Sequence, residues 1–430
     1  MAVAKETGFI ERKSKFNAAM FLEMLLFKVF DNATVSLNDH CVHVAMEHGV
    51  NIRKQSIDER FSSKSVEFVR TLLEQQLSTQ VARHIDVKGL CHFSSVMIKD
   101  STRFQIPEKF KEQYPGNGGL ASQAGMHIQF EYDLLSGKVN DLYVTNSLYQ
   151  DQKDTKQTAE MIEKGSLILR DLGYFSSQSI KNIALNEAFY ISRLDHKINI
   201  YTLKKSGRYK ELCRKKIHAF MKRKGLPAWE MNVYIGEDKV PVRLVVEMMP
   251  EEQLNQRLAK AHKDARRRGT GLSDRYLAAA SLNFFVTNTP QQWVSLENIR
   301  MLYRLRWQIE IRFKTWKSYC RIHTAKSMKL HRFETYLYAC LLFILIGWEI
   351  TAGLISFVWQ QRKKVISIIK CYKAIIQSGS KFREALLGSK EKLQQYLEFF
   401  YQMSYKELAL EKRKGHLSQE EILLFIMDKK

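Results

Sequence analysis

The stretch "YRLRWQIEIRFKTWK", residues 303–317, places a single acid among five arginines and lysines and four aromatic residues. It contains neither proline nor glycine, and most of its residues are tolerable or good helix formers, so we expect a helix. At about 100° per residue, one stripe about 60° wide along this helix holds Tyr303, Arg306, Glu310 and Lys317.

The arc beside this polar stripe is apolar and is expected to face a core. It contains Leu302, Leu305, Ile309, Phe313 and Trp316. The polar stripe therefore runs along the border of the buried face. On spacing alone, two interpretations remain open: a solvated face with spaced ion pairs, which is what charge runs usually are, or a functional site.

The composition describes an ordinary globular protein with an unusual charge. A chain of 430 residues, 45% hydrophobic and 26% charged, has room for about two or three domains. The 68 lysines and arginines outnumber 45 acids, for a net charge of +23. Such a chain attracts polyanions, so nucleic acid is the first partner to consider and an anionic membrane surface the second.

Cysteine usage and the N-terminal residues point to the cytoplasm. The six cysteines form no C-x-x-C pair, which argues against a zinc ribbon or a disulfide framework and fits a reducing compartment. The N-terminal stretch "MAVAKETGFIERKSKF" lacks the apolar core of a signal peptide.

One apolar run is long enough to cross a bilayer. It covers residues 335–359, and its one charged residue, Glu349, lies near the middle, where a carboxylate is costly in lipid. We therefore expect a buried central helix and no membrane partner, with a transmembrane span as the alternative.

Residues 1–90 are interpreted as a helical DNA-binding domain. Ser36 can cap a helix that ends at Gly49, and a second, basic helix follows. This order resembles a helix-turn-helix, with Arg53 and Lys54 near the end that would read DNA. A plain helical bundle yields the same spacing and remains the alternative.

Strand patterns begin near residue 92. "FSSVMIKD" ends in Asp100, and "MHIQFEYDL" with "VNDLYVTNSL" alternates as a β-hairpin. The buried strand in "SLILRDLGYFS" ends at Asp171, and the helix "SQSIKNIALNE" follows. Residues 91–187 thus predict a mixed α/β sheet with two aspartates emerging at strand ends.

The rest of the chain divides into three regions. Residues 188–290 are mainly strands, with ten lysines or arginines against one acid between 204 and 224. That run is either a DNA-binding groove or a solvated edge, and the net charge favours DNA. Residues 291–360 contain the opening helix and the apolar helix, and residues 361–430 are helical and basic.

Three acids then suggest one site. Asp100, Asp171 and Glu310, if held a few ångströms apart, cannot all stay ionised without a cation. Two Mg²⁺ ions about 3.5–4 Å apart would satisfy them and clamp the oxygens of an in-line phosphoryl displacement. Basic surroundings fit a polyanionic substrate: residues 300–332 hold ten lysines or arginines and one acid.

The spacing Y-x2-R-x3-E-x6-K, met at Tyr303, Arg306, Glu310 and Lys317, resembles the signature of bacterial insertion-sequence transposases of the DDE class, in the family named for that Y-R-E-K motif. "IKDSTRFQIP" around Asp100 and "LILRDLGYFS" look like that family's two aspartate blocks. "FFVTNTP" resembles the strand before the glutamate helix. The resemblance covers about residues 90–330.

The resemblance implies a fold of class α/β: a ribonuclease-H-like core interrupted by a mostly β insertion, with helical N-terminal and C-terminal regions. It implies that Asp100, Asp171 and Glu310 are catalytic and bind two divalent ions per site, Mg²⁺ or alternatively Mn²⁺. The implied activity is cleavage at transposon ends followed by strand transfer into target DNA, by a homodimer in the DNA complex.

The resemblance also implies which residues hold DNA. Tyr303, Arg306 and Lys317 occupy the positions that bind phosphates near the cut, and Trp307 and Lys314 occupy further DNA-contacting positions. No small-molecule substrate is expected, and the protein would be cytoplasmic, associated with the nucleoid when bound to DNA. The alternative is a sequence-specific DNA-binding protein without cleavage activity.

Overall fold

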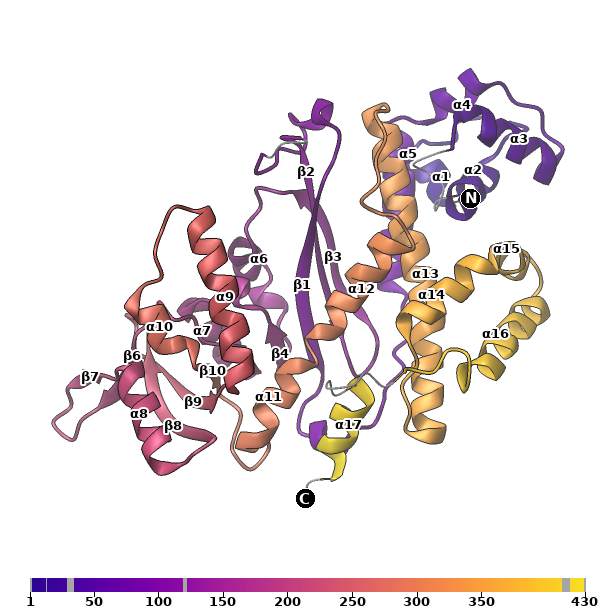
Figure 1. The fold of residues 1–430 in the computed structure, drawn as a ribbon. Helices are drawn as coiled ribbons and strands as arrows, with labels where there is room; N and C mark the ends of the chain where they lie inside the picture. Colours follow the sequence, from indigo (N-terminus) through magenta and orange to yellow (C-terminus); the bar gives the residue numbers. More distant parts are fainter. Residues whose placement is uncertain (1, 13, 29–34, 119–121, 412–417, 429–430) are drawn as a thin grey trace. The chain divides into compact units, whose positions relative to one another are not determined.

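The computed structural model describes residues 2–12, 14–28, 35–118, 122–411 and 418–428 of the chain (Figure 1). The chain forms two compact units, each built from segments that are distant in the sequence. Unit 1 comprises Met1–Asp86, Ser101–Tyr149 and Gln308–Glu420, and unit 2 comprises Val87–Asp100, Gln150–Trp307 and Glu421–Lys430.

Unit 2 is built on strands in the order β1-β4-β5-β10-β9-β8-β6-β7. β4 pairs in parallel with both β1 and β5, and the remaining pairs are antiparallel. The strands are β1 (Val96–Gln105), β4 (Leu167–Arg170), β5 (Phe189–Arg193), β6 (Ile200–Leu203), β7 (Tyr209–Glu211), β8 (Ala228–Ile235), β9 (Val240–Met248) and β10 (Leu282–Thr287).

Helices surround this sheet and fill its core with apolar side chains. Ile180 and Ile183 of α7 join the core formed by the strands, and Ser176 caps the helix through a capping box with Ser179. The helices are α6 (Asp151–Gln157), α7 (Ser177–Leu185), α8 (Arg214–Lys224), α9 (Glu251–Arg267), α10 (Asp274–Ala280) and α11 (Leu296–Arg304), and α17 (Gln419–Asp428) closes the described chain.

The segment between β5 and β10 contains more helix than its sequence indicated. The basic run that includes residues 214–224 folds as the helix α8, because Ile217 and Met221 are four residues apart and both are buried. Gly225 then ends the helix in the left-handed conformation, with a φ of 62°. The strands β6–β9 still form one antiparallel array in this segment.

In unit 1, β2 (Gly125–Asp133) and β3 (Val139–Asn146) form the expected antiparallel hairpin. Asp133 accepts the backbone N–H groups of Leu135 and Ser136, which fixes the turn. The helix α12 (Trp307–Ser318) packs on this hairpin through Trp316, whose ring centroid lies 4.8 Å from that of Phe130.

The first five strands hydrogen-bond in the order β3-β2-β1-β4-β5. The pairs β1/β4 and β4/β5 are parallel, and β2/β3 is the hairpin. This is a ribonuclease-H-like core, and the strands β6–β9 are inserted between its fifth strand and β10. The expected fold class is therefore confirmed.

The N-terminal helices follow the sequence signals in part. Ser36 caps α3 through a reciprocal capping box with Asp39, and Gly49 ends the helix with a φ of 64°, as expected. The helix α5 ends at Ser78, and the backbone N–H groups of Arg83 and Ile85 then bond to Ser136 and Leu135 in the β2–β3 turn. The helices are α1 (Ala2–Glu6), α2 (Ala18–Lys28), α3 (Leu37–His48), α4 (Lys54–Arg60) and α5 (Ser63–Ser78).

The apolar run forms α13 (Leu330–Arg362), the core helix of unit 1. Its most apolar window has a mean hydropathy of 2.1, enough to cross a membrane by length and composition, yet 72% of that window is buried inside the protein. Glu349 pairs with Arg83 at 2.5 Å. The expected buried helix is confirmed, and it packs against α2, α5, α14 (Ile368–Gln377) and α16 (Lys390–Ser404), with α15 (Gly379–Leu387) between the last two in sequence.

A buried ion pair links the strand β1 to the helix α6 in unit 2. The Nζ atom of Lys99, on β1, is 2.7 Å from Oδ2 of Asp154 on α6, and both side chains are almost completely shielded from solvent. Successive strand residues face opposite sides, so Lys99 points away from the side that Asp100 faces. The ion pair therefore fixes β1 on the face opposite to Asp100.

We predict that Asp154→Ala lowers the free energy of unfolding by about 3–5 kcal/mol, because it leaves the Lys99 ammonium buried without its carboxylate. The matched control is Glu187→Ala, which removes the exposed partner of Lys164 and should cost about 0–1 kcal/mol. Urea denaturation followed by circular dichroism measures both. Equal losses of stability in the two variants would contradict a stabilising role for the buried Lys99–Asp154 pair.

Candidate active site

Two aspartates follow the last paired residues of two adjacent parallel strands. The β1–β4 register ends at Lys99 opposite Arg170, so Asp100 and Asp171 come next on their strands. Asp171 ends its strand as expected. Asp100 does not, because β1 continues to Gln105 past the point where β4 stops. The shorter neighbour leaves Asp100 beside the end of β4.

The guanidinium of Arg306 lies between these carboxylates. Its Nη1 donates a hydrogen bond of 2.8 Å to Oδ2 of Asp100, and its Nε is 3.8 Å from Oδ1 of Asp171. Arg306 is buried, whereas the Asp171 side chain is 47% exposed. Burial strengthens the attraction, because less water screens the charges. One cation thus bridges two acids.

Tyr303 joins the same cluster. Its hydroxyl donates to Oδ1 of Asp171 at 3.4 Å, and its ring packs against Phe285. Burial and, next, the neighbouring Asp171 charge raise the pKa of Tyr303 to about 12. The shift extends to more alkaline pH the range over which the hydroxyl is protonated and can donate a hydrogen bond.

The predicted single helix over residues 303–317 is wrong at one point. α11 ends at Arg304 and α12 begins at Trp307, with Leu305 and Arg306 in a turn between them. In that turn, the N–H of Leu305 bonds to Leu302, a tighter i→i−3 pattern. The turn buries Leu305 completely while the Arg306 side chain reaches Asp100. Tertiary contacts outweigh helix propensity here.

The apolar arc around this break is buried as predicted. The polar positions of α12 form its more exposed face, at the helical spacing of Trp307, Glu310, Lys314 and Lys317. Trp307 is 57% exposed, which is unusual for so large an apolar side chain. Lys317 donates to the carbonyl oxygen of Arg103 at 3.2 Å, and burial lowers its pKa.

Asp100, Asp171, Tyr303 and Arg306 belong to unit 2, and the structure brings these four side chains together. Glu310, Lys314 and Lys317 belong to unit 1. Within the described ranges, no three histidine, cysteine, aspartate or glutamate side chains form a group that could hold a metal ion.

The residues proposed to read DNA at the N-terminus are exposed. Arg53 precedes α4 as its N-cap, and Lys54 is the first residue of the helix. Only seven residues long, α4 follows α3 after a turn, and Ile57 is the residue that it buries. This arrangement has the order of a helix-turn-helix and is equally that of a small bundle.

Arg312 of α12 is a buried cation that the sequence analysis did not predict. The guanidinium of Arg312 lies 3.7 Å from the ring centroid of Tyr132 and 4.3 Å from that of Trp348. Its Nη1 donates to the carbonyl oxygen of Gln308, and burial lowers its pKa. The angular position of Arg312, beside the apolar arc, was the signal that could have revealed it. Arg312 ties the helix to the hairpin and to α13 in unit 1.

Comparison with known proteins assigns the family. Residues 92–346, more than half of the chain, match the family described as "Transposase DDE domain". The transposase for insertion sequence element IS231F of Bacillus thuringiensis subsp. israelensis is 32% identical over 87% of this chain and 80% of its own length. The IS231B transposase of Bacillus thuringiensis subsp. berliner is 29% identical over 99% of this chain and 91% of its own.

Among solved structures, the cryo-EM structure of the piggyBac transposase synaptic complex with hairpin DNA is similar with a TM-score of 0.45, at 12% identity, over 97% of this chain and 83% of that one. The chain belongs to the Transposase DDE domain family of insertion-sequence transposases. It is accordingly a metal-dependent enzyme that cleaves and joins DNA in transposition, and a cytoplasmic protein.

We predict that Arg312→Ala lowers the free energy of unfolding by about 2–4 kcal/mol, because it opens a cavity and removes two cation–π contacts. Arg312→Met should cost less, since its side chain keeps much of the buried volume. Lys314→Ala, two residues away on the exposed face, is the control and should change stability by at most about 0.5 kcal/mol. Thermal unfolding measures all three, and a cost for Lys314→Ala equal to that of Arg312→Ala would refute the buried role.

Proposed function

We propose that Asp100, Asp171 and Glu310 are the catalytic, metal-binding residues of this transposase. The observation that carries the proposal is the Arg306 guanidinium between Asp100 and Asp171. These two carboxylates, which follow the last paired residues of β1 and β4, already hold one cation. Glu310, four residues after Arg306 and on the more exposed face of α12, would supply the third carboxylate.

The donor chemistry of the three proposed ligands suits a hard divalent ion. All three candidate ligands are carboxylates, and oxygen donors are those that Mg²⁺ and Mn²⁺ prefer. A buried charged partner is the expected companion of acids that must stay ionised. We propose Mg²⁺ as the usual ion, Mn²⁺ as a substitute, and two ions per site.

When bound, such ions activate the attacking oxygen and stabilise the leaving oxygen of a phosphodiester. The chain's own residues would orient the DNA. Tyr303, whose hydroxyl is protonated at neutral pH, would donate to a phosphate oxygen. Arg306 and Lys317 would add charge-assisted contacts, and a guanidinium suits phosphate because it offers parallel donors.

Two further residues of α12 are proposed to contact DNA. Trp307 exposes an aromatic face on which a base could stack, and Lys314 lies two turns further along the same face. Arg53 and Lys54, exposed at the start of α4, are proposed to bind the transposon end.

The proposed reaction starts with binding of both transposon ends by a homodimer. Cleavage at each end would release a 3′-hydroxyl, and each 3′ end would then attack a phosphodiester of target DNA. We further propose that the protein associates with the nucleoid when bound to DNA, and that it needs no membrane and no small-molecule substrate.

We predict that Glu310→Gln and Asp171→Asn each reduce DNA cleavage by at least about 100-fold, since even outer partners of a metal site cost about 10–100-fold when removed. Both substitutions keep side-chain size and remove one metal-binding charge. Binding to a fragment carrying the element's own terminus should stay within about twofold, because a neutral amide does not repel phosphate.

The measurement is a plasmid-cleavage assay with Mg²⁺, paired with gel-shift titration of the same preparations. Asp141→Asn, which neutralises an acid on the edge strand β3, is the control and should cut like the wild type. A Glu310→Gln variant that still cuts would remove the third ligand from the proposal.

We also predict that Arg306→Gln tightens Mn²⁺ binding to the DNA-free protein by about three- to tenfold, or about 0.7–1.4 kcal/mol. The reason is that the guanidinium competes with the ion for Asp100 and Asp171. Electron paramagnetic resonance of free Mn²⁺ during titration gives the affinity without any activity assay. Arg304→Gln carries the same charge change and should leave it unaltered; weaker Mn²⁺ binding in Arg306→Gln would contradict the competition.

A further inference from the structure

The last turns of α9 in unit 2 expose a row of cations that the proposed site does not use. Lys260, Lys263, Arg266 and Arg267 all face solvent, as does His262. None of the four lysines and arginines forms an ion pair with an acid among the residues whose side chains the structure describes. We call these five residues the α9 basic face.

A cation on the inward side of the same helix has partners within the fold. Arg257 donates to the carbonyl oxygens of Ala280 and Leu282 and to Oδ1 of Asn283, at 3.0, 3.3 and 2.8 Å. Ala265 is buried on that side. The helix is therefore held in unit 2 by its inward residues, and the outward cations contribute no comparable contact.

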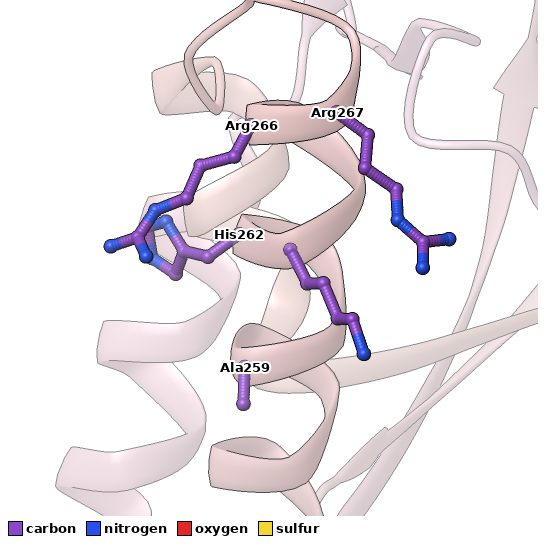
Figure 2. Close-up of a pocket in the computed structure, with 5 residues that line it drawn as sticks. Ala259, His262, Arg266 and Arg267 are labelled. Carbon is purple, nitrogen blue, oxygen red and sulfur yellow. The ribbon is translucent and has the colours of Figure 1, made fainter.

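The α9 basic face is organised as two rows with a gap between them. At about 100° per residue, His262 and Arg266 form one row and Lys263 and Arg267 form another, roughly 100° away around the helix. Ala259 lies between the two directions, and its small side chain leaves an open hollow lined by these residues. Figure 2 shows Arg266 and His262 extending to one side of the helix and Arg267 to the other.

A simpler account explains only part of this face. Cations in the last turn of a helix interact favourably with its dipole, and Arg266 and Arg267 are in that turn. The effect falls off within one turn, so it does not account for Lys260 or Lys263. The helix dipole also does not explain why two parallel rows of cations flank a small residue. A linear polyanion lying between the two rows would explain this arrangement.

We propose that the α9 basic face binds the sugar-phosphate backbone of duplex DNA without reading its sequence. Residues four apart are separated by about 6 Å along the axis of α9, which is comparable to two base-pair steps along the duplex axis, where each strand carries one phosphate per about 3.4 Å. A strand seated over Ala259 would have cations on both sides. This contact is additional to the proposed catalytic residues, and it rests on DNA being the substrate.

Two sources of DNA share this chemistry. The face could hold the transposon end beyond the cut, or the target duplex before strand transfer. Phosphate contacts carry no sequence information in either case, so the structure assigns the ligand class and the experiment separates the sources.

The test compares two triple variants of the full chain. Lys263→Gln/Arg266→Gln/Arg267→Gln removes three charges from the face. Lys381→Gln/Lys390→Gln/Lys392→Gln removes three charges from exposed lysines of unit 1 and is the matched control. Circular dichroism and thermal unfolding establish that both variants are folded before binding is measured.

Binding to a 30-base-pair duplex of mixed sequence, and to the terminal fragment of the encoding element, is titrated over a range of salt concentrations. A plot of log affinity against log salt concentration has a negative slope. Its steepness should decrease by up to about 2.7 in the α9 variant, because each lost phosphate contact reduces the magnitude of the slope by about 0.9. A fall on both duplexes means a shared contact, a fall on the mixed duplex alone assigns target DNA, and a fall on the terminus alone assigns the transposon end. An unchanged slope on both, or an equal fall in the control, overturns the proposal.

A single substitution probes the hollow itself. Ala259→Glu places a carboxylate between the two rows and should weaken binding to the affected duplex more than Ala259→Gln, which has nearly the same size. Equal binding by these two variants would also overturn the proposal. The catalytic proposal is separable, because the α9 variants keep Asp100, Asp171 and Glu310 and should still cut once DNA is saturating. Loss of cutting in Glu310→Gln does not depend on α9.

Discussion

Two carboxylates that come directly after the last paired residues of adjacent parallel strands repel each other unless a cation lies between them, and this part of unit 2 is arranged around that requirement. Asp100 and Asp171 follow the last paired residues of β1 and β4, and Arg306 lies between them. To reach this position, the chain breaks between α11 and α12 although the local sequence favours a continuous helix. The attraction between Arg306 and the two carboxylates thus accompanies a break in the helix. A site that already holds the Arg306 guanidinium is suited to exchange it for a metal cation.

Cations in this protein fall into two groups, which a net charge of +23 alone does not separate. Lys99, Arg257 and Arg312 are held by a carboxylate, by carbonyl oxygens or by aromatic rings, and they stabilise the fold. The outward residues of α9 have no such partner among the described side chains. Exposed charges that no carboxylate, carbonyl oxygen or aromatic ring of the described chain engages are available to a polyanion such as DNA.

The sheet explains how the proposed catalytic residues Asp100 and Asp171 are supported. β4 is short and completely buried, and β1 continues past it, so Asp100 is held by a strand on which Lys99 is fixed from the opposite side by Asp154. Rigid supports of this kind suit phosphoryl transfer, in which the protein contributes positioning and charge more than covalent chemistry. Within unit 1, Arg312 has the same supporting role for α12, because it fastens the helix that carries Glu310.

The sequence by itself determined the elements whose signals are local. The period-two hairpin, the Ser36 cap, the glycine at the end of α3, the apolar arc from Leu302 to Trp316 and the buried apolar helix all follow from hydrophobic periodicity or capping chemistry. The spacing of Tyr303, Arg306, Glu310 and Lys317 likewise suggested the chemistry. Only the tertiary structure decided the helix break at Leu305, the extension of β1 beyond Asp100, and the burial of Arg312 and Lys99. Each of these depends on a partner far away in the chain, and no local pattern reports the charge or ring that a side chain will meet.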